Sequence, residues 1–514
     1  MKFLEQPIEF SVLAGAAPAC HGFADAEQWV AYAQAIDTAG GRLVSLWGSD
    51  ERDRGRGFLL HAAFAMREGL AWVSLPLAAE DPTGPDLGAI FPAAQRLQRA
   101  LYDMLGIRSD GGDTRPWLRH NNWPADFFPL RRDADGTRQF PPEPEEYAFV
   151  RVEGDGVHEI PVGPIHAGII EPGHFRFSIV GEKVLRLEER LGYKHKGIAK
   201  RFQSLPLNEG HRLAGRVSGD STVAYAWAYC QAAESITACA VPERALWLRG
   251  LFLERERIAN HLGDLGALGN DAALGFGLAQ FLRLKENWLR QNQRLFGHRF
   301  AMDCVVPGGC ACDIDPGGAD RLLAQCDSIE QEVRTLKHIY DDHSGLQDRF
   351  LTTGRLTPKL AARLGVTGLL GRASGLATDL RLDAPFAPYD RIEFNMASHR
   401  NGDVAARVIV RFEEIFESLR LLRQILRGLP DGEVRTALTS SADGGLGVGW
   451  VEGWRGEILV ALEAGPGGSI RQCHCHDPSW QNWPALEHAV IGNIVPDFPL
   501  INKSANLSYS GQDL

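Results

Sequence analysis

Histidines and a carboxylate that could move protons lie in two stretches of the sequence. His166 and His174 flank the loop IHAGIIEPGH, His195 lies in YKHKG, and Asp271 ends the run NHLGDLGALGND. A histidine–aspartate pair at the base of a cavity can carry protons, because burial and a partner charge bring both pKa values toward neutrality. The same residue types also cap helix ends, so the residues alone leave both roles open.

A third stretch, RVSGDS (216–221), places Ser218 and Ser221 around a glycine with the spacing that two cysteines of a metal-binding loop would have. Serine hydroxyls stay protonated near pH 7 and are poor ligands for soft metals. Taken alone, the stretch is either an ordinary turn before a helix or a metal site whose ligands have been lost.

Close thiol pairs occur twice. Cys310 and Cys312 stand in GGCACD, and Cys473 and Cys475 stand in QCHCHD, where a histidine follows each cysteine. Structural zinc sites prefer wider spacing, since one intervening residue strains a shared tetrahedral ion. We interpret both pairs as thiols without a metal.

Composition and charge narrow the function classes. The chain has 514 residues, 44% of them hydrophobic, and a net charge of −11, which argues against binding to nucleic acid or to an anionic membrane surface. No apolar run reaches the ~18 residues of a membrane span, and the odd number of cysteines, nine, suits a reducing compartment. We expect a cytoplasmic protein. It lacks the P-loop, dinucleotide and serine-hydrolase motifs.

The elements that must position these residues fall into two domains. Residues 1–130 combine strands at 42–48 and 70–77 with an amphipathic helix at 91–107. Residues 131–147 are charged and rich in proline, which predicts a linker.

Residues 148–514 begin with strand-like runs and then become strongly helical. The expected strands are EYAFVRV, HFRFSIV, KVLRLEERL and, near the end, GWRGEILVALEAG. Long amphipathic helices are expected at 242–268, 278–296, 319–340 and 402–426. The predicted fold class is α+β: a small N-terminal α/β domain, then a large, mainly helical bundle with peripheral strands.

Nearly all of the chain resembles known redox subunits. IFPAAQRLQRALYDMLGI and WPADFFPLRRD are similar to the 30-kDa subunit of complex I. The remainder resembles the 49-kDa subunit of complex I and the large subunit of energy-converting nickel–iron hydrogenases of the formate hydrogenlyase type. The matching pieces include GPIHAGIIEPGHFRF, YKHKGIAKR, ERERIANHLGDLGALGND, GVTGLLGRASGLATDLR, EGWRGE, DPSWQNWPAL and NIVPDFPLINKSANLSYSGQDL.

The resemblance answers the question raised by RVSGDS. In the hydrogenases the matching segments read R-x-C-G-x-C and D-P-C-x-x-C, and their four thiolates hold nickel and iron. This chain has Ser218, Ser221, Ser508 and Gly511 at those positions, and Ala199 replaces an acidic residue used for proton transfer. The resemblance therefore implies a degenerate site without the metal centre.

In complex I the equivalent cavity binds the quinone headgroup. The tyrosine that contacts the quinone falls on Gly219, and the aspartate of the same site matches Asp271. The histidine of that site falls in the loop that carries His166 and His174, and both remain candidates. Tyr225 is either a substitute phenol or a core residue.

Other cavity residues also follow from the resemblance. Lys196 takes the place of an arginine near the terminal iron–sulfur cluster, and Arg216 and Asp220 complete the expected polar lining, with His195.

The resemblance implies a peripheral-arm subunit of a membrane-bound oxidoreductase complex, with no cofactor bound directly. Its partners would be a small iron–sulfur subunit and antiporter-like membrane-arm subunits, its candidate ligand a quinone, and its place the cytoplasmic face of the inner membrane. The alternatives are a redox-inert scaffold that gates an ion-translocating module, and a hydrogenase with atypical ligands.

Overall fold

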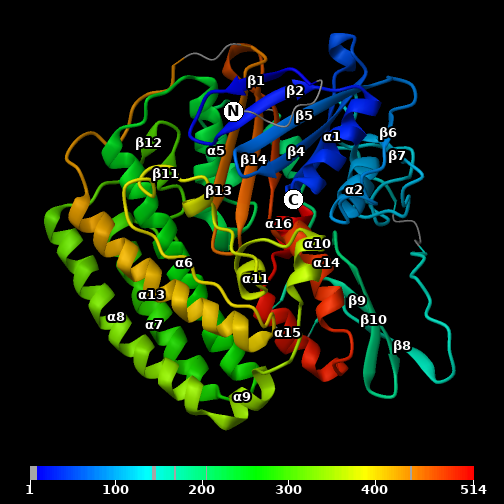
Figure 1. Cartoon of the computed structure of the whole chain (residues 1–514). Helices are drawn as coiled ribbons and strands as arrows, with labels where there is room; N and C mark the ends of the chain where they lie inside the picture. The colour runs from blue at the N-terminus through cyan, green and yellow to red at the C-terminus, as the bar shows by residue number, and fades with distance from the viewer. Residues whose placement is uncertain (1–7, 142–145, 167–169, 204, 440–442) are drawn as a thin grey trace.

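The computed structural model describes residues 8–141, 146–166, 170–203, 205–439 and 443–514. An N-terminal sheet and a bundle of long helices lie on opposite sides of a central three-stranded sheet (Figure 1). The fold is α+β, as the sequence predicts.

The N-terminal sheet has five strands in the order β1-β2-β5-β4-β3, and only β2 and β5 run parallel. Its strands and helices are β1 (Phe10–Leu13), β2 (Ala19–Phe23), α1 (Ala26–Thr38), β3 (Arg42–Asp50), β4 (Phe58–Met66), β5 (Gly69–Leu77) and α2 (Ala94–Leu105). The expected helix at 91–107 and the strands at 42–48 and 70–77 are confirmed. Tyr32 of α1 packs edge-on against Phe64, so the helices cover one face of the sheet.

The other face of this sheet packs against β13 (Leu446–Glu452), β14 (Glu457–Ala464) and β15 (Ile470–His476). Because side chains alternate along a strand, Trp47 points to this face, where it stacks on His474 with ring centroids 4.8 Å apart. Trp72 and Trp450 extend the same buried cluster. The N-terminal domain is therefore joined to the rest of the chain by an apolar interface as well as by the segment at 131–147.

That segment is held at both ends by the folded parts. Arg131 Nε donates to Leu105 O at 2.8 Å, and Arg99 Nη2 donates to the Tyr147 hydroxyl at 2.7 Å. The expected strand at 146–152 is wrong: these residues form no strand, and Val150 N donates instead to the Glu188 carboxylate. The following strands, β8 (Val157–Val162), β9 (His174–Val180) and β10 (Lys183–Arg190), form an antiparallel sheet that projects from the body (Figure 1).

The helical bundle contains all four predicted long helices. They are α6 (Glu243–Asp271), α7 (Gly275–Phe296), α8 (Pro316–Asp342) and α13 (Val404–Gly428). Asp315 and Asp403 cap α8 and α13 by accepting bonds from the amides of Gly318 and Ala406, which satisfies helix N-terminal donors.

Shorter elements close the fold around the bundle. They are β6 (Thr83–Pro85), β7 (Arg108–Asp110), α3 (Ile198–Phe202), α4 (Gly210–Ala214), β11 (Val305–Val306), β12 (Gly309–Cys310), α9 (Ser344–Phe350), α10 (Pro358–Leu364), α11 (Gly368–Ala373), α12 (Leu380–Asp383), α14 (Ser479–Ala489), α15 (Phe498–Ala505) and α16 (Tyr509–Asp513). No helix of the described residues is long and apolar enough to cross a membrane.

Helix α5 (Thr222–Ile236) lies directly on β13. A Cβ atom at Gly447 or Gly449 would overlap the carbonyl oxygens of Ala232 and Ala228, so only glycine allows this close approach. The contact fixes the helix that follows RVSGDS against the central sheet.

A cluster of buried charges ties α6 and α13 to α11, α12 and β13. Its members are Glu254, Arg257, His261, Arg372, Asp379, Arg381, Glu414 and Glu452, each at most 3% exposed. Arg372 bridges the Glu414 and Glu452 carboxylates with two 2.8 Å bonds, and Arg381 holds Asp379 at 2.7 Å. Four carboxyls thus meet three guanidinium groups, and burial, together with Asp379, raises the pKa of Glu452 to about 7.

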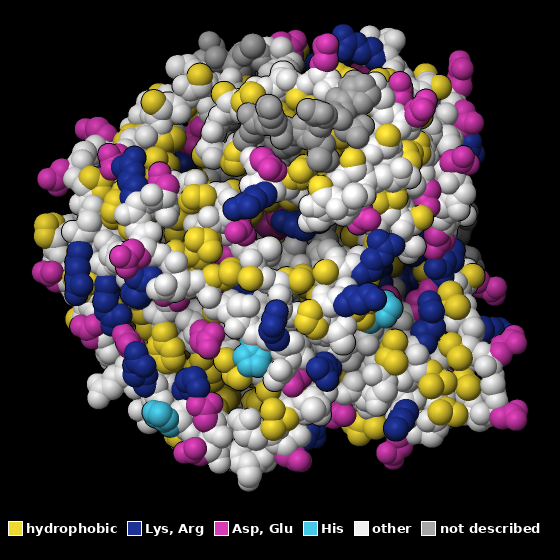
Figure 2. All heavy atoms as spheres, viewed as in Figure 1, with side chains coloured by type: hydrophobic (Ala, Val, Ile, Leu, Met, Phe, Trp, Pro, Cys, Tyr) yellow, Lys and Arg dark blue, Asp and Glu magenta, His cyan; other side chains and the backbone are white. Residues whose placement is uncertain are grey.

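On the face shown in Figure 2, basic and acidic side chains are interspersed, with small groups of hydrophobic ones between them. The net negative charge of the chain is therefore not gathered into one patch on this face.

Candidate active-site cavity

A cavity of about 1000 Å³ lies between the helical bundle and residues 498–510. Its walls come from α6, α7, the RVSGDS loop, residues 162–166 and 170–175, and the segment from Phe498 to Ser510. Its charged lining residues are Glu171, Asp220, Asp264, Asp271, Lys285, Arg455 and Lys503. Apolar side chains such as Phe175, Leu278 and Phe498 line the rest, so the cavity suits a ligand with both polar and apolar parts.

Two of the four positions that the resemblance assigns to metal ligands, Ser218 and Ser508, line this cavity, and Ser221 and Gly511 lie next to them. Ser218 Oγ and Ser508 Oγ lie 2.9 Å apart, although 290 positions separate them in the chain. Gly511 N donates to Ser508 Oγ at 2.8 Å, and Ser221 Oγ lies 3.4 Å from Arg455 Nη1. Two segments that are far apart in sequence therefore bring these positions together.

Asp220 and Arg455 form an ion pair beside these positions. Arg455 donates to Asp220 through Nη1 at 2.8 Å and Nη2 at 2.5 Å, and Ser218 Oγ donates to the same carboxylate at 2.7 Å. Burial raises the pKa of Asp220, but the charge and hydrogen bonds of Arg455 outweigh it and lower the pKa to about 2. Asp220 is therefore a fixed negative charge at neutral pH.

Two lysines and two aspartates add further charge to the lining of the cavity. Lys503 Nζ lies 3.7 Å from Asp264, which also accepts bonds from Arg411 and Asn506. Burial lowers the pKa of Lys285. Asp271 lies at the C-terminal end of α6 and is exposed as a residue. Partial desolvation of its carboxyl group still raises its pKa, while Lys503 opposes the shift.

The two candidate histidine partners of Asp271 are both bonded elsewhere. His166 Nε2 donates to Gly173 O at 2.8 Å, and His174 Nδ1 to Gly163 O at 3.1 Å. His166 lines the cavity, whereas His174 is buried behind its wall, where burial lowers its pKa. The structure does not bring either ring to Asp271 among the contacts of the described residues.

His195 and Lys196 contact the C-terminal segment rather than the large cavity. His195 Nδ1 donates to Asp513 O at 2.8 Å, and Lys196 Nζ donates to Val217 O and Ser510 O at 2.9 and 3.1 Å. Burial raises the pKa of Asp513 to about 7, although two backbone amides oppose it. Lys196 thus joins the RVSGDS loop to the segment that carries Ser508.

Arg216 and Tyr225 also lie outside the cavity. Arg216 is exposed and forms a two-point ion pair with Asp303, with distances of 2.8 and 2.7 Å. Tyr225 is buried and donates to Asp477 at 2.7 Å. This bond, together with burial, raises the pKa of Tyr225 well above its usual value.

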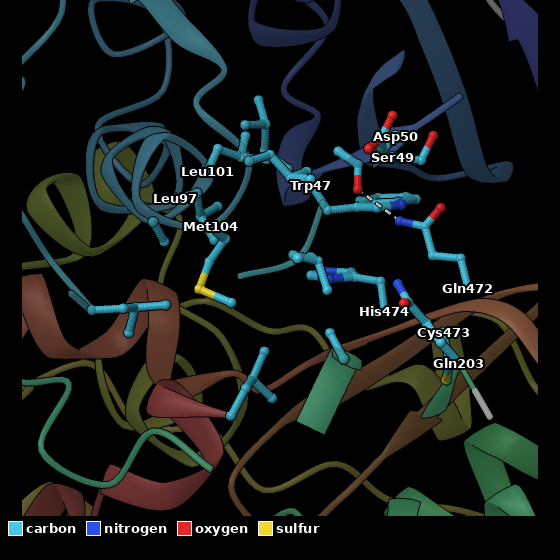
Figure 3. Close-up of a pocket in the computed structure, with 18 of the residues that line it drawn as sticks. Trp47, Ser49, Asp50, Leu97, Leu101, Met104, Gln203, Gln472, Cys473 and His474 are labelled. Carbon is cyan, nitrogen blue, oxygen red and sulfur yellow. Dashed lines mark hydrogen bonds between the residues drawn. The ribbon is translucent and has the colours of Figure 1, made fainter. Parts of the chain in front are cut away.

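A smaller, mostly apolar cavity of about 90 Å³ lies between the N-terminal domain and β15 (Figure 3). Leu97, Leu101 and Met104 of α2 approach it from one side, and Trp47 and His474 from the other (Figure 3). His195 and Ala199 line this cavity, so these two positions from YKHKGIAK do not belong to the large one.

The cysteines form no recognisable metal site. Among the described residues, no group of three or more histidines, cysteines, aspartates or glutamates is arranged to hold a metal ion. Instead of pairing with its neighbour Cys310, Cys312 interacts with Cys304, which raises the pKa of the Cys304 thiol. The sequence did not indicate this pair, because Cys304 and Cys312 flank the two paired strands β11 and β12 and are brought together only by that pairing.

The four degenerate positions do not fit a thiolate-bound metal centre. At three of the positions that the resemblance assigns to thiolates this chain has hydroxyl groups, which are weak donors for soft metals. A Cβ atom at Gly511 would overlap the Asp477 carboxylate, so the fourth position has neither a donor nor the space for one. These residues therefore do not fit nickel and iron held in the manner of the hydrogenases.

Sequence reasoning missed the basic residues of the cavity. Arg455, Lys285 and Lys503 face Asp220 and Asp264 from segments distant in the chain. Arg455 lies in EGWRGE, one of the segments that resemble the two families, and this segment could have indicated that Arg455 belongs to the site. Lys285 has the sequence pattern of an exposed face of an amphipathic helix.

Two family descriptions match the sequence. Residues 23–140 match "Respiratory-chain NADH dehydrogenase, 30 Kd subunit", and residues 276–443 match "Respiratory-chain NADH dehydrogenase, 49 Kd subunit". The 30-kDa match thus precedes the 49-kDa match along the chain.

Individual relatives extend the similarity over almost the whole chain. Formate hydrogenlyase subunit 5 of Escherichia coli is 31% identical over 485 residues, which are 92% of this chain and 85% of the relative. Hydrogenase-4 component G of the same organism is 32% identical over 486 residues, 92% of this chain and 84% of the relative. An NADH-quinone oxidoreductase subunit of Phocaeicola vulgatus is 28% identical over 82% of this chain and 85% of the relative.

A solved structure shares the fold. One chain of the membrane-bound sulfane sulfur reductase, an archaeal respiratory membrane complex, superposes with a TM-score of 0.66 at 23% identity. The match covers 70% of this chain and 99% of that one.

Proposed function

Because the chain belongs to the family of fused 30-kDa and 49-kDa subunits of complex-I-like and hydrogenase-related respiratory complexes, we propose that its cavity receives a quinone-like electron acceptor. In this proposal the chain is a peripheral-arm subunit that takes electrons from a partner's iron–sulfur cluster. It couples their transfer to ion movement in membrane-arm subunits.

The cavity of about 1000 Å³ is the observation that carries the proposal. Its mixed lining suits a headgroup that accepts hydrogen bonds and an apolar tail, and its wall lacks the donors that a nickel–iron centre needs.

Gly219 provides a sharp test of the quinone proposal. A Cβ atom at this position would meet no atom within 4 Å, so a side chain there projects into the open cavity. Gly219→Tyr is expected to fold normally and to bind a short-chain quinone roughly two- to tenfold more tightly, the effect of one added hydrogen bond. Binding would be measured by competition against a photoreactive quinone on the assembled complex.

Gly219→Phe is the matched control, because it adds the ring without the hydroxyl. The photoreactive quinone is expected to label peptides from 260–285 or 498–510. The phenylalanine variant should not show the tighter quinone binding of the tyrosine variant. Labelling elsewhere, or no saturable labelling in either variant, would argue against a quinone in this cavity.

The scaffold alternative has its own support. Gly219 replaces the phenol that the resemblance assigns to quinone binding, and neither candidate histidine contacts Asp271 among the described residues. A complex that assembles and moves ions while the cavity binds no quinone would favour this second function.

The metal content of the purified complex separates both proposals from a hydrogenase with atypical ligands. Since four thiolate positions carry Ser218, Ser221, Ser508 and Gly511, we expect far less than one nickel per copy of this chain. Elemental analysis should be normalised to this chain, with the iron of the partner's clusters counted separately. About one nickel per chain would restore the hydrogenase alternative.

A further inference from the structure

A third cavity, smaller than the two described above, shares part of its lining with the large one. Its volume of about 10 Å³ is close to the space that one water molecule needs. Asp220 and Asn260 line both cavities, so they form the partition between them. On its outer side the small cavity ends at Phe300, which is 40% exposed, and at Ala301.

Glu256 of α6 is the other titratable side chain that lines the small cavity. It is 8% exposed, and its carboxyl oxygens accept bonds from Val223 N at 2.7 Å and Ala224 N at 3.3 Å, in the first turn of α5. A helix N-terminus favours a carboxylate. Burial nevertheless dominates these two bonds and, with the nearby charge of Asp220, raises the pKa of Glu256 to about 8.

The groups around Glu256 make it the proton-bearing carboxyl of this small cavity. Asp220 is fixed as a carboxylate by Arg455, and Arg257 contributes a weaker positive charge from α6 itself. From helix α7, Leu289 and Asn292 line the small cavity. The amide oxygen of Asn292 accepts a bond from Arg255, and its amide nitrogen donates to Arg299 O. Asn260 donates to Asp220 O at 2.7 Å and to Glu256 O at 2.9 Å, which links the partition to α6.

We propose that Glu256 carries protons between the solvent near Phe300 and the large cavity, through one water molecule in the small cavity. This inference rests on the proposed function. Reduction of a quinone to a quinol consumes two electrons, supplied by the partner's iron–sulfur cluster, and two protons. Glu256 releases one proton past Asp220 and Asn260, becomes a carboxylate, is reloaded from solvent, and then releases the second proton by the same route.

Glu256→Gln tests this role against that of a helix cap. The amide oxygen of glutamine still accepts the Val223 N–H, so the cap and the fold should persist, but no proton can be released. In membranes with the assembled complex, quinone reduction is expected to fall about 100-fold, the usual contribution of a positioned acid–base group. Glu243→Gln, a surface position on the same helix, should retain wild-type rates.

An infrared titration tests the same carboxyl without any substrate. The wild-type complex should show a protonated-carboxyl band that disappears with a midpoint near the pKa of about 8 and shifts in heavy water. The band should be absent in Glu256→Gln and present in Glu243→Gln.

The two readouts separate failure of this inference from failure of the proposed function. Wild-type rates and pH profile in Glu256→Gln, or a carboxyl band that this substitution leaves unchanged, would overturn the role of Glu256. A wild-type complex that reduces no quinone would overturn the proposed function, whereas a titrating, solvent-exchanging band would still support Glu256 as a proton carrier to the cavity.

Discussion

Arg372→Met is expected to lower the free energy of unfolding by about 3–5 kcal/mol, because it leaves buried carboxylates without their partner. Arg372 is fully buried and bridges Glu414 and Glu452. Its loss would also raise the pKa of Glu452 further, since Arg372 is the main group that lowers it. The shift of the urea midpoint, followed by tryptophan fluorescence, measures the effect.

Arg391→Met is the matched control. Arg391 pairs with Glu243 on the surface, where both side chains are about half exposed, and exposed pairs contribute roughly 0–1 kcal/mol. Equal midpoint shifts for the two variants would mean that the buried cluster does not anchor the bundle as described.

Asp220→Asn is expected to reduce quinone reduction by the assembled complex about 100-fold, the cost of misplacing a reacting group by about 1 Å. The carboxylate positions Arg455 through two charged hydrogen bonds and also accepts the bond from Ser218. Without that charge, the buried Arg455 has only neutral hydrogen-bond acceptors such as Asn506 O beside it, and the partition between the two cavities loses its geometry. Rates would be measured in membranes after assembly has been checked by native electrophoresis.

Asp271→Asn is the informative comparison, because Asp271 also lines the cavity but is exposed to solvent. Because substitutions at exposed positions usually have small effects, we expect the rate of quinone reduction to change by roughly twofold, equivalent to about 0.5 kcal/mol. A loss as severe as that of Asp220→Asn would instead support the direct role that the family resemblance assigns to Asp271.

The long helices could be predicted because their apolar periodicity extends over many turns. The run 242–268 contains enough matching positions to define α6 within three residues at each end. The run at 146–152 alternates in the same manner as a strand, yet its residues bond to the side chain of Glu188 instead of a neighbouring strand. A short alternating pattern does not specify its partner, and the partner decides whether a strand forms.

Part of the site followed from motifs, and the remainder depended on tertiary structure. Ser218 and Ser508 could be assigned to one shell only because both lie in recognisable family segments. The pairing of Asp220 with Arg455 spans 235 positions, and no local pattern indicates it. Glu256 stands among the charged residues of ERERIANHL, and its burial against the first turn of α5 distinguishes it from an exposed helix residue.

The route of the chain around the large cavity has a consequence for biosynthesis. Ser510 N donates to the Glu171 carboxylate, and these two wall residues are 339 positions apart. At 5–20 residues per second, a ribosome adds the second roughly 20–70 s after the first. Until the segment 498–510 has been added, the cavity lacks one of its walls, so the apolar lining contributed by the earlier segments has no cover from it. Any ligand or partner that requires a complete wall must therefore arrive after translation has passed Ser510, and a chaperone that shields residues 170–175 and α7 would act before then.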